Sequence, residues 1–536
     1  GAFVFLVDDV PAVRCRLTEK DEAWAFVLEM KEGLFGDDTV ANVKAVDSAL
    51  RKVGAEHGSD GTTSGPIGKT RVSCLGADCS AWPLERFLKK PGACACGSRS
   101  AAPSGQQHVA VPAPTSTPLG HVHVIALTDS WSMAKGGAAT INMELCRLFA
   151  AHGAKVDCLV LEDGPLAGTV QDGVSLIGRK KDGEFKAAVP SPKETFRIAD
   201  GASVVVIGHG HFYGPAAGKQ VQLLKEGGVG QARLMLVMHT DPHDTEAAKG
   251  GDDIQGRAQA KVDAIRGLAE EHKAIVVSVG PRLHKFWKGK LFGRVPLANC
   301  LQFDPGFDSM ADEVWTRVKD EVEEMHEKDK PVILIAGRLD DENVKGFRTA
   351  MDAVNAVGQA QRGAGTGMRP TIYALGVKED ADVIKFLSAV DIANGVEAHA
   401  MDYTTDREEY FLELCKATMV LMPSRAEGYG LVAQDAIAVG TPVVVTERSG
   451  FVELLKTVGK DKVDVSGMSA PTPYVSETAQ EAVVVEEWKK RVTKLVTQTK
   501  TARQATVQVR ELFRANAKQS AEQLVLSLAQ VAAASK

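Results

Sequence analysis

A glycine-rich turn, Glu427-Gly428-Tyr429-Gly430, is the segment whose residue types are best suited to binding a phosphate-bearing ligand. The apolar run before it, Ala417–Met422, is short enough to be a buried strand and stops at Pro423, whereas Leu431–Val439 repeats apolar residues at helical spacing. A turn between a strand and a helix directs backbone N–H groups and the helix N-terminus at a ligand above the sheet. The β-branched run Thr441–Thr446 predicts the next strand of a parallel sheet.

A second group of charged residues follows another predicted strand. Pro331–Ala336 is a continuous apolar run typical of a strand buried on both faces, and Gly337-Arg338 follows it directly. Lys345-Gly346 comes about seven residues later. An arginine fork and a lysine point charge can neutralise a diphosphate and stabilise it as it leaves, with no metal needed. The alternative is that Arg338 and Lys345 are surface residues flanking a loop.

An earlier strand and helix surround a glycine pair. His121–Leu127 has the composition of a strand and Thr140–His152 that of an amphipathic helix, with Lys135-Gly136-Gly137 between them. The missing side chains of Gly136 and Gly137 would let a diphosphate approach the helix N-terminus. By themselves, two glycines are more often a simple tight turn.

Histidines follow two further predicted strands. Leu234–Met238 is followed by His239, and Ser203–Ile207 is followed by His209 and His211. Ligand-facing residues collect at the carboxyl ends of strands in open α/β sheets, although a lone histidine there is often only a loop residue. For His209 and His211 we consider two interpretations, contact with an acceptor substrate or a glycine-rich turn without chemistry.

The two charged segments together resemble a known enzyme family. The pattern from Pro423-Ser424 through Glu427-Gly428-Tyr429-Gly430-Leu431-Val432 to Gly440-Thr441-Pro442 resembles that of retaining, nucleotide-sugar-dependent glycosyltransferases of the GT-B fold, fourth family. Gly337-Arg338 with Lys345-Gly346 is a second match. The resemblance covers residues 119 to 530 and implies an α/β fold with two Rossmann-like domains facing across a cleft.

The resemblance also implies roles for individual residues. Glu427 would bind hydroxyls of the transferred sugar, His239 would face that sugar, and Arg338 and Lys345 would hold the diphosphate. The remaining donor-binding residues would be Gly136, Gly137, Gly428, Tyr429, Gly430, Leu431, Val432 and Asp435. Asp435 would take the ribose hydroxyls, and it departs from the family, which has a second glutamate after seven intervening residues.

The implied reaction transfers a sugar from a nucleotide-diphosphate donor, for which we expect a UDP-sugar, to an unknown acceptor with retention. The leaving phosphate itself would deprotonate the acceptor, so we expect no cofactor, no required metal and no paired-carboxylate glycosidase site. Asp252/Asp253 and Asp340/Asp341 are interpreted as solvated acidic turns. Two alternatives are an inactive nucleotide-sugar-binding protein with a signalling or scaffold role, and, with less support, a sugar-nucleotide epimerase.

Composition excludes several other classes of protein. The 536 residues are 44% hydrophobic and 25% charged, with a net charge of -6, so nothing favours a nucleic-acid partner or an anionic membrane. No apolar run is long enough for a membrane span, and we expect a cytoplasmic location. Cys146, Cys158, Cys300 and Cys415 lie singly in apolar segments and are predicted to be buried thiols. Zinc or a disulfide at Cys74, Cys79, Cys94 and Cys96 is a weaker hypothesis, because the spacing is unusual for a zinc site.

Changes of composition along the chain predict five segments. Residues 1–96 are a small helical or α+β domain with helices over Ala23–Leu34 and Thr39–Val53, and residues 97–118 are a Pro/Ser/Ala-rich linker. Residues 119–328 and 329–480 are the acceptor-side and donor-side Rossmann-like domains, and 481–536 are helices that partly cross back to the first domain. Residues 1–96 either bind a protein partner or pack as an extension on the catalytic domain.

Overall fold

The computed structural model describes residues 118–536 apart from 134–135, 162–167, 180–191, 329, 337–341, 364–368, 378–385, 391–395, 403, 405, 460–461, 473–478 and 534–536. Of residues 1–117 it describes the backbone of five strands. The chain divides into two compact units, Gly1–Pro112 and Ala113–Lys536. The division falls inside the segment 97–118.

The smaller unit contains one five-stranded sheet in the order β1-β2-β3-β4-β5. Strands β1, β2 and β3 form an antiparallel meander, β4 pairs parallel with β3, and β5 pairs antiparallel with β4. The strands are β1 (Ala2–Val7), β2 (Val10–Lys20), β3 (Ala23–Met30), β4 (Arg71–Cys74) and β5 (Trp82–Pro83).

The predicted helix over Ala23–Leu34 is wrong, because residues 23–30 form β3. Trp24, Phe26, Leu28 and Met30 alternate along this segment, a period of two that favours a strand over a helix. The predicted helix over residues 39–53 lies outside the described residues. So do Cys79, Cys94, Cys96 and the side chain of Cys74, and with them the zinc hypothesis.

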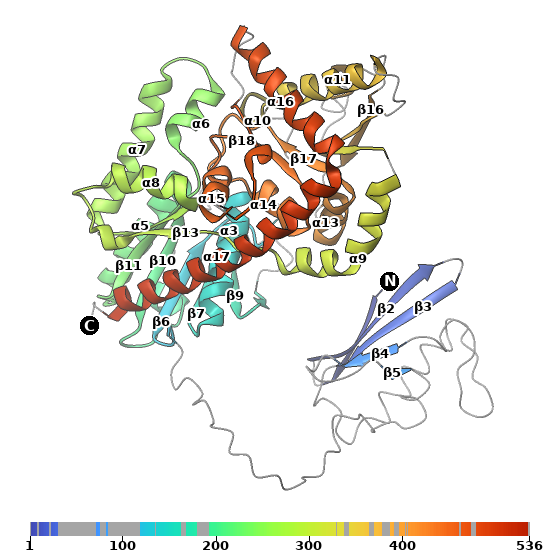
Figure 1. Cartoon of the computed structure of the whole chain (residues 1–536). Coiled ribbons are helices and arrows are strands. Elements are labelled where there is room, and N and C mark those ends of the chain that lie inside the picture. Colours follow the sequence, from blue (N-terminus) through green and yellow to red (C-terminus); the bar gives the residue numbers. More distant parts are fainter. Residues whose placement is uncertain are drawn as a thin grey trace, which may run out of the picture. The chain divides into compact units, whose positions relative to one another are not determined.

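The first domain of the larger unit is built on an eight-stranded sheet in the order β13-β12-β11-β10-β6-β7-β9-β8 (Figure 1). All its pairings are parallel except that between β8 and β9. Its strands are β6 (Val122–Leu127), β7 (Lys155–Leu161), β8 (Val170–Gln171), β9 (Val174–Arg179), β10 (Ser203–His209), β11 (Ala232–Met238), β12 (Ile275–Val279) and β13 (Cys300–Phe303). Strands β6 and β10 are buried at every residue, as the apolar composition of a parallel strand between helical layers requires.

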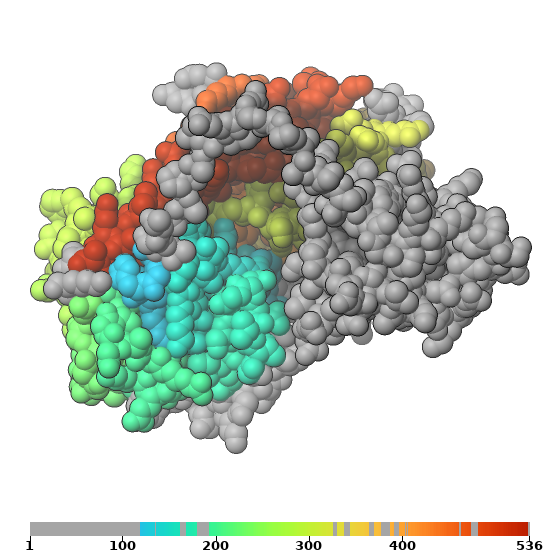
Figure 2. Space-filling model, turned by 90° about the horizontal axis from the view of Figure 1, so that it is seen from below, coloured from blue at the N-terminus to red at the C-terminus, as the bar shows by residue number. Residues whose placement is uncertain are grey.

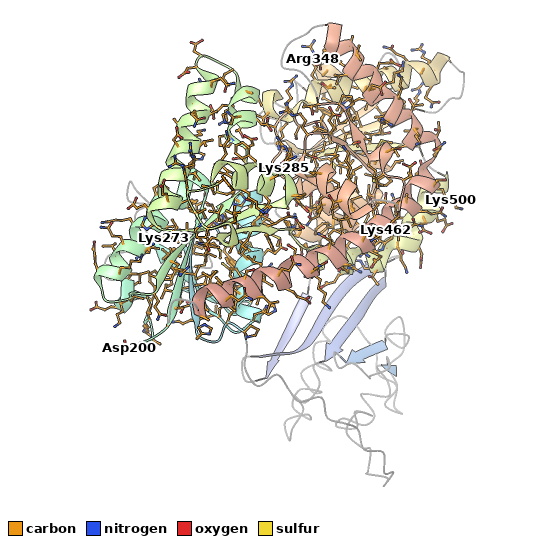
Figure 3. All side chains as sticks on the ribbon, turned by 60° about the vertical axis from the view of Figure 1, so that its left-hand side comes forward. Asp200, Lys273, Lys285, Arg348, Lys462 and Lys500 are labelled. Atoms are coloured by element: carbon orange, nitrogen blue, oxygen red, sulfur yellow. The ribbon has the colours of Figure 1, made fainter. Side chains whose placement is uncertain are left out.

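Helices connect these strands and cover the faces of the sheet. They are α3 (Gly137–Ala151), α4 (Pro192–Thr195), α5 (Gly210–Glu226), α6 (Pro242–Lys249), α7 (Ile254–Glu271), α8 (Gly280–Lys290), the short 3-10 helix η4 (Leu297–Asn299) and α9 (Ser309–Lys328). Helix α8 packs against α15 (Gly450–Gly459) of the second domain, and Lys285 of α8 lies where the two domains meet (Figure 3).

The second domain contains a six-stranded, all-parallel sheet in the order β16-β15-β14-β17-β18-β19. Its strands are β14 (Val332–Ala336), β15 (Thr371–Val377), β16 (Glu397–Asp402), β17 (Met419–Met422), β18 (Val443–Thr446) and β19 (Ser469–Ala470). Its helices are α10 (Glu342–Lys345), α11 (Phe347–Gly363), α13 (Arg407–Lys416), α14 (Leu431–Ala438), α15 (Gly450–Gly459), the 3-10 helix η7 (Ser466–Met468) and α16 (Ala479–Thr497). Two α/β sheets are therefore present, the second all parallel and the first parallel apart from β8, and this agrees with the two Rossmann-like domains that the sequence predicts.

The last helix, α17 (Thr499–Ala533), contacts both domains. Arg510 Nε donates to the carbonyl of Ala438 over 2.6 Å, and Ser520 Oγ accepts from the Asp304 N–H over 2.8 Å. At its far end the Ala532 carbonyl accepts from Ser203 Oγ of the first sheet. Figure 2 shows this end of α17, in red, lying against the blue and green residues of the first domain.

One apolar cluster extends from the first domain into the second. It joins residues such as Val124 and Val237 of the first sheet with Val420 and Val445 of the second sheet and Leu524 of α17. Cys146, Cys158, Cys300 and Cys415 are buried and unpaired, which confirms their prediction as free core thiols. No helix among the described residues is long and apolar enough to cross a membrane.

Candidate active site

The glycine-rich turn joins β17 to α14, as the sequence predicts. Gly430 is the N-cap of α14 with φ of 114°, a conformation that residues with a side chain rarely adopt. Gly430 supplies no side-chain cap, and the first turn of α14 contains no acidic residue. The positive end of α14 is therefore not neutralised by its own first turn, which suits it to an anionic ligand.

Lys345 and Glu427 form an ion pair beside this turn. Lys345 Nζ lies 3.1 Å from Glu427 Oε2, and both side chains keep partial exposure, at 31% and 19%. The pair forms because β14 and β17 are parallel neighbours, so the segments after their carboxyl ends lie together. The Arg425 N–H also donates to the Val344 carbonyl over 2.7 Å. Arg338 lies outside the described residues.

The glycine pair of the first domain lies against the start of α14. Gly136 has φ of 105° and is the N-cap of α3. A Cβ placed on Gly137 would lie 3.2 Å from Leu431 Cδ1, so a larger residue there would crowd α14. The structure thus brings Gly136–Gly137 and the Gly428–Val432 segment together from two domains.

His239 lies across from the same turn. The space that a Cβ on Gly428 would need is occupied by the His239 carbonyl oxygen. The His239 Nε2 and His209 Nδ1 atoms are 2.8 Å apart, and His209 Nε2 lies 2.8 Å from Asn142 Oδ1. Burial lowers the pKa of His239 to about 4. His239 is therefore neutral near pH 7 and held by a buried polar chain.

Three charged residues connect the domains next to Glu427. Arg282 of α8 donates from Nη1 to the Glu427 carbonyl over 3.1 Å and also forms an ion pair with Asp244 of α6. Arg448, from the turn after β18, donates to the other oxygen of Asp244 over 2.8 Å. The backbone of the glycine-rich turn is therefore fixed from the first domain.

Asp435 lies in a separate cavity of about 380 Å³. The Asp435 Oδ2 atom is 3.4 Å from Arg407 Nη2, and burial raises the pKa of Asp435 to about 6 although Arg407 opposes this. The cavity is lined by residues of α3, α13, α14, α17 and residues 304–308 between β13 and α9, which we call the crossing segment. They include Thr140, Glu144, Arg147, Asp308, Arg407, Leu431, Gln434 and Asp435. Glu427 and Lys345 do not line it, so the structure does not place Asp435 in one cavity with the ion pair.

Several charged residues of this region are not evident as site residues from the sequence. Glu144, Asp308 and Arg407 at the cavity, and Asp244, Arg282 and Arg448 between the domains, were not among the candidates. For two of these residues the sequence does contain a signal, namely their position: Arg282 follows β12 and Arg448 follows β18, at the carboxyl ends of strands. Their partners come from distant segments, which spacing does not reveal.

Glu144 of α3, which lines the cavity, should make the stability of the fold depend on pH. Burial is the main cause that raises the pKa of Glu144 to about 8, and the nearby carboxylates of Asp308 and Asp435 act in the same direction. The hydrogen bond from the Gly306 N–H and the charge of Arg147 oppose this rise. The folded protein thus keeps a proton that the unfolded chain releases near its ordinary value of 4.5. We expect stability to fall as the pH rises from about 4.5 to about 8, by on the order of 5 kcal/mol at about 1.4 kcal/mol per pKa unit, with Asp435 adding to the loss below pH 6.

The substitution Glu144→Gln should remove most of this slope, because glutamine is neutral in both states. Urea unfolding near pH 5 and near pH 9 measures it, with the exposed Glu194→Gln as the matched control. An unchanged slope in Glu144→Gln would assign the pH dependence to another group.

Two parallel α/β domains that present their strand ends to each other, with a final helix in contact with both, define the GT-B class of glycosyltransferases. A family model described as "Family 4 Glycosyltransferase in conflict systems" matches residues 125–524. The chain belongs to this family and is a glycosyltransferase. Among curated proteins, none matches this sequence.

Solved structures support the fold. Sucrose-phosphate synthase from Thermosynechococcus elongatus has a TM-score of 0.54 at 15% identity, over 77% of this chain and 99% of that one. An E. coli trehalose-6-phosphate structure bound with UDP-2-fluoro glucose has a TM-score of 0.52 at 11% identity, over 76% and 99%. A UDP-forming α,α-trehalose-phosphate synthase from Burkholderia vietnamiensis has a TM-score of 0.52 at 10% identity, over 76% and 99%. At these identities the likeness establishes the GT-B fold alone.

Proposed function

We propose that the protein transfers a sugar from a UDP-sugar to an acceptor with retention of the anomeric configuration and without a required metal. Family membership supports sugar transfer. The structural neighbours described as UDP-forming, or bound with UDP-2-fluoro glucose, support UDP as the leaving group.

The observation that carries the proposal is the Lys345–Glu427 pair beside the uncapped start of α14. A lysine charge and a helix N-terminus can share the negative charge of a diphosphate, while the Glu427 carboxylate can accept hydrogen bonds from sugar hydroxyls. Lys345 already has an anionic partner, so a diphosphate would compete with Glu427 for it. Arg338 is proposed to provide the second positive charge.

In the proposed reaction the bond between the anomeric carbon and the phosphate oxygen breaks, and the electron pair leaves with UDP. The acceptor oxygen attacks from the same face, and its proton passes to the departing phosphate. Charge develops on the diphosphate, where Lys345 and the amides of the turn stabilise it in the transition state.

A panel of UDP-sugars in a thermal-shift assay tests donor binding, because a ligand that binds only the folded state raises the melting temperature. The stabilising donor is then incubated with EDTA and a set of sugar and sugar-phosphate acceptors, and NMR reports the anomeric configuration of the product. We expect α-linked product from an α-linked donor in EDTA. An inverted product, or activity that EDTA abolishes, would contradict retention or metal independence.

The alternative is a protein that binds a nucleotide sugar without turnover. The observation favouring it is the engagement of Asp435 with Arg407 in a cavity apart from Glu427. Donor binding with neither transfer nor hydrolysis, across all acceptors tried, would establish this alternative and exclude the enzyme.

A further inference from the structure

Three polar side chains of the first domain form a continuous chain that the proposed reaction does not by itself explain. Asn142 comes from α3, His209 ends β10, and His239 follows β11. Because β10 and β11 are parallel neighbours, their carboxyl ends bring the two histidines to one edge of the sheet. The ring centroids of His209 and His239 are 5.0 Å apart. Asn142 and His209 are both buried, whereas His239 is partly exposed.

The donor and acceptor roles along this row of side chains can be assigned by starting from Cys158. The Cys158 thiol lies 3.9 Å from the Leu159 carbonyl, to which it can only donate. Its sulfur is then the acceptor for Asn142 Nδ2, which lies 3.5 Å away. This turns the Asn142 amide so that Oδ1 faces His209, and Oδ1 can only accept.

The position of the hydrogen on each histidine ring follows in the same way. His209 Nε2 must carry a hydrogen to donate to Asn142 Oδ1, which leaves Nδ1 of a neutral His209 as an acceptor. His239 Nε2 must therefore carry the hydrogen that fills the 2.8 Å contact. Burial lowers the pKa of His209 well below its usual range, with His239 adding to the effect, so both rings are neutral near pH 7.

We propose that Asn142 and His209 are positioning residues that hold His239 in its Nε2–H tautomer and leave Nδ1 as a hydrogen-bond acceptor for a hydroxyl of the transferred sugar. No partner for His239 Nδ1 is found among the described residues. The carbonyl of His239 lies against Gly428, so the ring is attached to backbone that already contacts the donor turn. The role in sugar recognition rests on the proposed function, whereas the tautomer does not.

This arrangement predicts the class of donor sugar that the site accepts. A nitrogen lone pair accepts from a hydroxyl but repels a carboxylate and gains nothing from a deoxy or fluoro position. The site therefore favours a neutral, hydroxylated sugar over a uronic acid at the carbon that meets His239. Losing one such hydrogen bond corresponds to about a tenfold loss of kcat/KM for the matching deoxy donor.

The tautomer is tested directly by the side-chain carbon and nitrogen shifts of His239 in histidine-labelled protein without ligand. We expect a single Nε2–H form in the wild type, and a mixture with the Nδ1–H form in Asn142→Leu, which removes the amide oxygen at similar volume. His209→Phe is the second variant, since it keeps a ring but breaks the chain. His211→Phe, at the second residue of α5, is the matched control and should leave the His239 signals unchanged.

A wild-type His239 in the Nδ1–H form, or a tautomer that both variants leave unchanged, would overturn the proposal even if the enzyme transfers sugar. With the donor identified by the UDP-sugar panel, monodeoxy analogues test recognition. One analogue should lose about tenfold in kcat/KM with the wild type and much less with Asn142→Leu. Equal losses in both proteins would remove the recognition role and leave the tautomer result standing.

Discussion

The substitution Lys345→Ala is expected to lower kcat/KM for sugar transfer by about a thousandfold, equivalent to roughly 4 kcal/mol of transition-state stabilisation. Lys345 is the cation that the structure places within 3.1 Å of Glu427, at the end of α10 and beside the start of α14. In the proposed reaction negative charge grows on the departing diphosphate, and without this cation the helix N-terminus and the proposed second cation, Arg338, would have to stabilise it. Steady-state kinetics with a saturating acceptor measure the effect.

The role of Lys345 can be separated from simple pairing with Glu427. Isothermal titration with UDP should show weaker binding by Lys345→Ala, by about tenfold or more, because a charge-assisted contact to phosphate is lost. Glu427→Gln removes the ion pair but keeps the lysine, and should preserve UDP affinity while reducing transfer. The surface variant Lys416→Ala, which loses only an exposed pair with Glu413, is the control. Unchanged UDP affinity in Lys345→Ala would limit Lys345 to holding Glu427.

Much of the donor-side domain could be predicted because its central strands carry a strong local signal. The runs that form β14, β17 and β18 are almost wholly apolar, since helices cover both faces of the sheet, and glycine or proline marks their ends. Lys345 and Glu427 follow two of these strands. Their proximity is a property of parallel neighbours, which the order of strands supplies once the fold class is known.

Edge strands escaped the sequence interpretation for the opposite reason. Strand β16 lies at the edge of the second sheet and reads EAHAMD, with no β-branched residue and no apolar run. Strand β8 lies at the edge of the first sheet and is only two residues long. In β3 the apolar residues alternate with a period of two, but they also fit helical spacing over this short segment, which led to the wrong prediction of a helix.

The charged groups around Asp435 could not be predicted because they meet only in three dimensions. Glu144, Asp308 and Arg407 belong to α3, the crossing segment and α13, which are far apart in the sequence. From the sequence, Asp435 stands out only as an aspartate where the family has a glutamate. The structure shows that its surroundings also matter, since burial and Arg407 act in opposite directions on its pKa.

The substitution Gly428→Ala tests the contact between the two domains with a single methyl group. The added Cβ would occupy the position of the His239 carbonyl oxygen and lie 3.2 Å from Leu283 Cδ1. A backbone carbonyl at the end of β11 cannot move aside as a flexible side chain can, so the turn and the first domain must separate. Gly428 does not have the positive φ of Gly430, and the effect is therefore one of space and not of backbone strain.

We expect Gly428→Ala to lower kcat/KM by about a hundredfold or more, because small displacements of reacting groups are costly in a closed site. UDP binding should change far less, since Lys345 and α14 remain in their own domain. Gly267→Ala in α7 is the matched control, because no atom lies within 4 Å of its added Cβ and alanine favours a helix. Hydrogen exchange at residues 239–249 should accelerate in Gly428→Ala alone, as the α6 segment loses its contact with the turn. If Gly428→Ala has the same kinetics and hydrogen exchange as the wild type, the glycine-rich turn and the His239 segment do not meet so closely in solution. That result would remove the structural basis for placing His239 at the donor sugar.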